Sequence, residues 1–75
     1  MMHKMQTLHS EVTGTVWKIE APVGTAVAEG ATIVIVESMK MEIPVCALQA
    51  GVVRELHVAE GDAVAEGQPV AVVGR

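Results

Sequence analysis

The sequence contains an internal repeat with an offset of 37 residues. Without a gap, the 23 residues from Gly14, GTVWKIEAPVGTAVAEGATIVIV, align with the 23 residues from Gly51, GVVRELHVAEGDAVAEGQPVAVV. Nine of the 23 positions are identical, where composition alone would give roughly two. A chain of 75 residues is the size of one small domain. The repeat therefore predicts a single domain over residues 1–75 with approximate two-fold symmetry.

Both halves alternate between apolar and other residues in the manner of β-strands. Ile33 and Ile35 in the first half correspond to Val70 and Val72 in the second, with the period of two that a strand requires. Glycines punctuate the apolar runs at places where turns are expected, and no segment of useful length has a helical period. We therefore expect an all-β fold of about eight short strands. They would form a flattened barrel or sandwich of two four-stranded antiparallel sheets.

The offset also predicts what lies at the two ends of the domain. A strand over Met41–Ala47 has its counterpart over Lys4–Ser10. Adding 37 to Lys40 runs past the last residue, Arg75. The chain ends would thus occupy the place that the turn around Lys40 occupies in the other half. We expect Lys40 at one end of the domain and both termini at the other.

The stretch from Glu37 to Glu42, ESMKME, lies between two predicted strands. We expect the first strand to end at Glu37 and the second to begin at Glu42, with a tight hairpin between them. Short hairpins normally carry Asn-Gly, Asp-Gly or another glycine-containing pair, but this one carries Met39 and Lys40. A turn without turn-forming residues suggests that its side chains serve another purpose. Methionine is an adaptable apolar side chain that suits a surface over which a partner closes.

The overall charge argues against two classes of partner. The net charge is −4, and the five Lys and Arg residues are scattered, so neither nucleic acid nor an anionic membrane is expected. No apolar run approaches the roughly 20 residues that span a bilayer. A single cysteine cannot form an internal disulfide, and we expect a cytoplasmic protein. The three histidines and the cysteine match no common metal-ligand spacing, so no metal is expected.

With these features in place, the sequence resembles the biotinyl/lipoyl attachment domain family. ESMKME is similar to the motif in which a lysine between two methionines is biotinylated. The segments GTVWKI, VAEG, AGVVREL, EGDAVAEG and VAVV follow in the order that this family shows. The family often has Ala where this chain has Ser38. The ungapped repeat leaves no room for the thumb that some members insert, so the chain resembles a small thumbless biotin carboxyl carrier protein.

The resemblance implies a set of roles for the turn. Lys40 would be the biotin attachment site, Met39 and Met41 would be recognised by the ligase, and the hairpin flanks would be Glu37, Ser38 and Glu42. A biotin protein ligase would acylate the Lys40 amine. The attached biotin would then carry a carboxyl group between a biotin carboxylase and a carboxyltransferase, in an acyl-CoA carboxylase-type complex. Tethering raises the effective concentration at both sites. The domain itself would be a non-catalytic carrier and not an enzyme.

The amine does not look self-activating. A lysine amine in water is almost wholly protonated at neutral pH, and carboxylates nearby would favour the protonated form further. We therefore expect the ligase to supply the base and the activated acyl donor, while the carrier presents an exposed arm on a rigid hairpin.

Two other readings of the sequence remain open. A lipoyl-bearing acyl carrier domain would use the same fold and a lysine at the same tip, but lipoyl sites usually have an acidic residue before the lysine and a small one after it. Met39 and Met41 favour biotin over lipoate. An unmodified β-sandwich that serves only as an interaction module would carry no group on Lys40.

Overall fold

The computed structural model describes residues 5–75 and contains eight strands, as the repeat predicts. No helix occurs in this part of the chain, so it offers no helix that could cross a membrane. The strands are β1 (Met5–His9), β2 (Gly14–Ile19), β3 (Ala26–Val27), β4 (Thr32–Ser38), β5 (Met41–Cys46), β6 (Gly51–Leu56), β7 (Ala63–Val64) and β8 (Pro69–Gly74).

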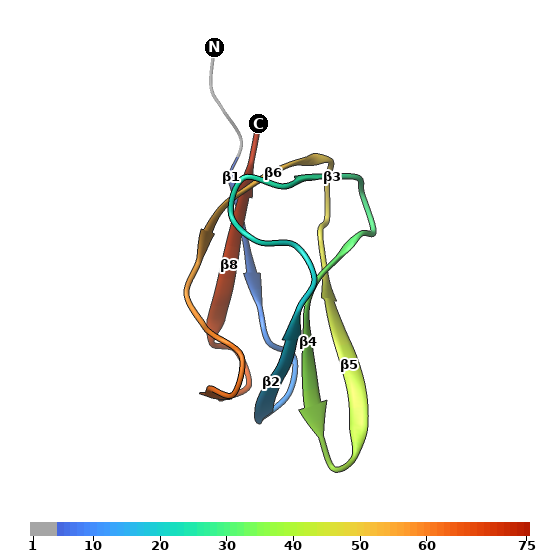
Figure 1. Cartoon of the computed structure of the whole chain (residues 1–75), viewed down its shortest axis with the longest axis vertical. Helices are drawn as coiled ribbons and strands as arrows, with labels where there is room; N and C mark the ends of the chain where they lie inside the picture. Colours follow the sequence, from blue (N-terminus) through green and yellow to red (C-terminus); the bar gives the residue numbers. More distant parts are fainter. Residues whose placement is uncertain (1–4) are drawn as a thin grey trace.

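The strands form two four-stranded antiparallel sheets, which confirms the predicted fold class. One sheet has the order β1-β8-β6-β3 and the other has the order β5-β4-β2-β7. Exchanging the two halves of the repeat, β1 for β5, β2 for β6, β3 for β7 and β4 for β8, turns the first order into the second. Each sheet therefore contains strands from both halves, and the two halves interlock (Figure 1).

The symmetry extends to single hydrogen bonds between the halves. The backbone N–H of Gly24 donates to the carbonyl of Val53, and the N–H of Gly61 donates to the carbonyl of Val16, both at 2.8 Å. Both donors are glycines with a positive φ, at +96° and +93°, a conformation that only glycine adopts without strain. These hydrogen bonds attach the connection after β2 to strand β6, and the connection after β6 to strand β2.

The core lies between the sheets and consists mainly of valine. Val residues are β-branched and fit a pleated, closely packed face. Leu56 and Ile19, which correspond in the repeat, pack against the rim of this core. The buried apolar residues are Leu8, Val16, Ala21, Ile33, Val34, Val36, Val45, Ala47, Val53, Val58, Val64, Val70, Ala71 and Val73.

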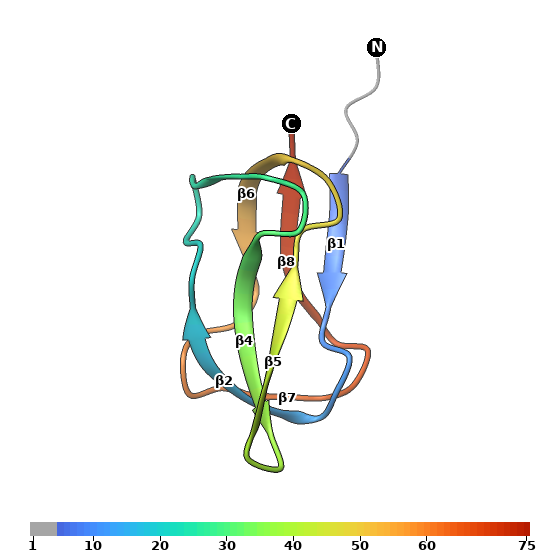
Figure 2. The same ribbon diagram turned by 90° about the vertical axis from the view of Figure 1, so that its right-hand side faces the viewer.

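The two ends of the sandwich differ as the offset predicts. The β4–β5 turn projects from one end, while β1 begins and β8 ends at the opposite end (Figure 2). Met5 pairs with Gly74 in the β1–β8 ladder, in the place where Glu42 pairs with Glu37 in the β5–β4 ladder. In the part of the chain described, the first half therefore ends in a closed hairpin where the second half ends in two adjacent chain segments.

Candidate functional site: the β4–β5 turn

The turn is tighter than the sequence suggests. We expected β4 to end at Glu37 and β5 to begin at Glu42, but the ladder continues to the pair Ser38–Met41. Only Met39 and Lys40 lie outside the strands. The prediction was wrong by one residue on each side, because a two-residue loop lets both flanking residues keep their ladder pairing.

Met39 and Lys40 both have left-handed backbone conformations, with φ of 52° and 65°. Two consecutive positive φ values are the mark of a type I′ turn, whose twist matches that of the two strands it joins. Residues with a side chain at Cβ adopt this region at a cost of about 1–2 kcal/mol each. The chain therefore places methionine and lysine at the two positions where Asn-Gly would be more stable.

This backbone predicts that Met39→Asn stabilises the protein. Asn tolerates the left-handed region better than Met, and unlike glycine it adds little freedom to the unfolded chain. We expect the free energy of unfolding to rise by about 0.5–1 kcal/mol in a urea titration followed by far-ultraviolet circular dichroism. Met41→Asn, at a strand position, is the matched control and should not stabilise. An unchanged or lower urea midpoint for Met39→Asn would contradict the turn geometry.

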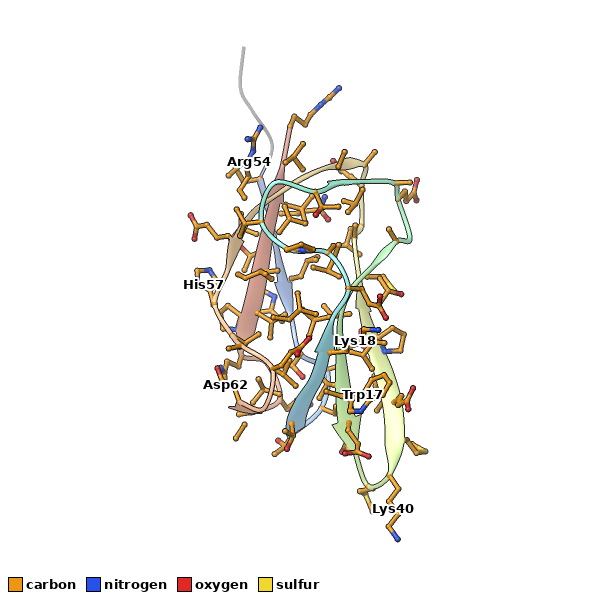
Figure 3. The ribbon with its side chains drawn as sticks, viewed as in Figure 1. Trp17, Lys18, Lys40, Arg54, His57 and Asp62 are labelled. Carbon is orange, nitrogen blue, oxygen red and sulfur yellow. The ribbon has the colours of Figure 1, made fainter. Side chains whose placement is uncertain are left out.

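The side chains of the turn are open to solvent. Met39 is 92% exposed and Met41 is 61% exposed, and Lys40 is also exposed. Figure 3 shows the Lys40 side chain extending beyond the end of the sandwich with its amine at the outermost point. Methionine is an adaptable apolar side chain that suits a surface over which a partner closes. The arrangement offers an amine on an unbranched stem between two adaptable apolar side chains.

The strands beneath the turn carry two carboxylates, one on either side of Lys40 in the sequence. Glu37 and Glu42 face each other across the β4–β5 ladder, and both are exposed. Among residues 5–75 the one side-chain ion pair joins His57 and Glu55, at 3.3 Å. Lys40 thus has no carboxylate within ion-pair distance in this part of the chain, and its amine stays available.

Ser38 has a structural part that the sequence did not indicate. Its Oγ donates a hydrogen bond of 2.9 Å to the backbone carbonyl of Thr13, just before β2. Alanine at this position could not make that bond. The bond ties the base of the hairpin to the neighbouring strand, and it helps to hold the turn at a defined place.

The other residues of interest in the described part of the chain lie away from the turn. Lys18 is exposed on β2, and Lys4 and His3 fall outside the described residues. Within residues 5–75 no three His, Cys, Asp or Glu side chains are grouped in a way that could hold a metal ion. A hollow of about 380 Å³ between β1 and β5 is lined by residues such as His9, Cys46 and Leu48 and by none of the ESMKME residues. The turn is therefore a projection and not a pocket.

Comparison with known proteins agrees with this geometry. A biotin/lipoyl attachment protein of Bacillus subtilis is 41% identical over 61 residues, which cover 81% of this chain and 84% of that protein. A protein of Mycobacterium leprae named as a homologue of the biotinylated protein TB7.3 is 35% identical over 68 residues, or 91% of this chain and 96% of that one.

Among solved structures, the urea carboxylase of Kluyveromyces lactis superimposes with a TM-score of 0.89 at 40% identity. The match covers 93% of this chain but only 6% of the urea carboxylase chain. A family model described as "Biotin-requiring enzyme" matches residues 9–73. The resemblance seen in the sequence is thereby confirmed, and the chain belongs to the biotin/lipoyl attachment domain family.

Proposed function

We propose that the chain is a biotin carboxyl carrier and that biotin is attached to Nζ of Lys40. The observation that carries the proposal is the Met-Lys-Met sequence at a solvent-exposed two-residue turn, with the amine at the tip of the hairpin end of the sandwich (Figure 3). Relatives named as a biotinylated protein homologue and a urea carboxylase support biotin as the group carried.

Attachment would be an acyl transfer in which this chain is the substrate. The Lys40 nitrogen attacks the carboxyl carbon of an activated biotin, an amide bond forms, and the bond to the activating group breaks. The amine must lose its proton to react, and no carboxylate within residues 5–75 lies within ion-pair distance to take it. The biotin protein ligase would therefore supply both the base and the activated acyl donor.

After attachment, the chain contributes position and not bond-making. The rigid sandwich holds the turn at one end, the Ser38–Thr13 bond fixes the base of the hairpin, and the lysine stem lets the attached group move. Biotin supplies a ureido ring that accepts and releases a carboxyl group. The partners would be a biotin carboxylase and a carboxyltransferase of an acyl-CoA carboxylase-type system, and tethering would raise the local concentration of biotin at both.

We place the protein in the cytoplasm, as the single cysteine suggests.

Lipoate is the second candidate for the carried group, because the relative from Bacillus subtilis is named for both biotin and lipoate attachment. The apolar pair Met39 and Met41 favours biotin. A lipoyl site usually has an acidic residue before the lysine and a small residue after it. Here Lys40 follows Met39, which is 92% exposed, and precedes Met41.

Intact-mass measurement separates these functions. The wild-type protein would be incubated in parallel with a biotin protein ligase, biotin and ATP, and with a lipoate ligase, lipoate and ATP. We expect one biotin per chain, retention on avidin, and no lipoate. A protein that takes up lipoate alone, or that gains no mass with either ligase, would show that the proposal is wrong.

A further inference from the structure

Trp17 is the one tryptophan of a protein without Phe or Tyr, and the fold holds it half in solvent, at 49% exposure. The β2–β4 register shifts between Val16 and Lys18, so Trp17 is the extra residue of a β-bulge. Bulges re-aim side chains. Figure 3 shows Trp17 and Lys18 on the same side of β2, away from β6 and β8. The indole therefore lies on the outer face of the sheet that carries the Lys40 hairpin.

The neighbours of Trp17 on that face form two rows across the sheet. Ile35 of β4 pairs with Lys18 of β2 and with Pro44 of β5, so the row beside the indole contains one exposed lysine and two apolar side chains. The next row toward the turn contains the opposed pair Glu37 and Glu42. We call these six residues, Trp17, Lys18, Ile35, Pro44, Glu37 and Glu42, the Trp17 face.

The charge of the Trp17 face indicates the chemistry of its partner. Like charges directly opposite each other destabilise a strand pair, and neither Glu37 nor Glu42 has a cation within ion-pair distance among residues 5–75. The indole is half exposed and Pro44 is exposed, so apolar surface lies beside the two carboxylates. The surface that complements this face has an apolar pocket for the indole, Lys or Arg side chains opposite the two carboxylates, and no cation opposite Lys18.

We propose that the Trp17 face is the docking surface for the biotin protein ligase, an inference that rests on the proposed function. The ligase must bring Nζ of Lys40 itself to its acyl donor, and the lysine stem has only four carbons, so the ligase must cover the hairpin closely. Enzymes that act after attachment reach the ring through a longer arm and have no need to cover this face.

The size of an ordinary interface places Trp17 within it. A standard interface buries about 800 Å² on each partner, which corresponds to a disc of roughly 16 Å radius. Trp17 follows Val16, which pairs with Val36, and Val36 lies four positions before Lys40. Four strand residues span roughly 13 Å, and with the step of about 5 Å from β4 to β2 and one further residue, the backbone of Trp17 lies roughly 16 Å from that of Lys40, at the edge of such a disc. A ligase centred on the turn would therefore reach the indole.

The repeat supplies a matched control for the test. Arg54 occupies the corresponding bulge on the other sheet, where the β6–β8 register shifts between Val53 and Glu55. Trp17→Arg therefore gives the β2 bulge the residue that the β6 bulge already carries. Arg54→Trp makes the reverse exchange at the β6 bulge. Initial rates of biotin attachment would be measured against carrier concentration with a purified biotin protein ligase and ATP. We expect Trp17→Arg to lower kcat/KM at least about tenfold, mainly through a higher KM, and Arg54→Trp to change it less than about twofold.

A second measurement tests the contact without catalysis. Because the chain has one tryptophan, 5-fluorotryptophan gives a single ¹⁹F resonance, whose chemical shift should change when the ligase is added without ATP. Trp17→Phe should retain most of the attachment rate, since it keeps an apolar ring. Far-ultraviolet circular dichroism establishes that each variant is folded.

The outcomes separate the inference from the proposed function. Absence of biotin on the wild-type protein would defeat the proposed function itself. Wild-type and Trp17→Arg proteins labelled at equal rates, with an unmoved ¹⁹F resonance, would overturn the docking inference alone. A resonance that responds to a biotin carboxylase but not to the ligase would assign the Trp17 face to the wrong partner and would also overturn it.

Discussion

Lys40→Arg is expected to abolish biotin attachment completely. Arginine keeps the charge, the length and the unbranched stem of lysine, so the exposed turn should fold unchanged. Its guanidinium stays protonated under all ordinary conditions and has no free amine pair with which to attack a carboxyl carbon. The variant should show no added mass after incubation with a biotin protein ligase, biotin and ATP, and it should not bind avidin.

Lys18→Arg is the matched control. Lys18 is also exposed, but it lies within β2, where the backbone is fixed in the ladders to β4 and β7, and its neighbours are Trp17 and Ile19 instead of two methionines. We expect Lys18 to take up no biotin in the wild-type protein. The Lys18→Arg variant should therefore be labelled to the same extent as the wild type. Any biotin remaining on Lys40→Arg would move the site to another lysine.

The repeat alone was enough to predict the number of strands, the two-fold symmetry and the position of Lys40 at one end. The offset of 37 residues recurs in the observed bounds, as in β2 (Gly14–Ile19) and β6 (Gly51–Leu56). This worked because each half must bury its alternate residues, and a period of two leaves little choice of secondary structure.

Strand pairing could not be predicted in the same way. A repeat buries the same residues whether each half forms its own sheet or the two halves interlock, and the structure shows that they interlock. The backbone conformation of the turn could not be predicted either. Nothing in Met39-Lys40 favours a positive φ, and that conformation is imposed by the twist of the flanking strands. The Ser38–Thr13 bond and the bulge at Trp17 depend on the strand pairing. They could therefore not be predicted from the sequence.

Gly14→Ala is expected to lower the free energy of unfolding more than Gly24→Ala or Gly51→Ala does. A Cβ at Gly14 would overlap the backbone carbonyl oxygen of Glu37 and lie 3.1 Å from Cγ1 of Val36. A carbonyl in a ladder cannot rotate away, so β2 and β4 must separate at the base of the turn. Overpacking of this kind costs about 3 kcal/mol, out of a total stability of about 4–11 kcal/mol for 75 residues.

Two further glycines show why this loss should be specific. Gly24→Ala places its Cβ in open space and adds only the strain of φ +96°, about 1–2 kcal/mol. Gly51→Ala, the counterpart in the repeat, places its Cβ 2.6 Å from the carbonyl oxygen of Gly74. This approach is less close than the overlap at Gly14, so a smaller shift relieves it. Urea titrations should therefore rank the losses with Gly14→Ala largest. If Gly14→Ala unfolds at the wild-type midpoint, the close approach of β2 to β4 beneath Lys40 is not a feature of the folded protein.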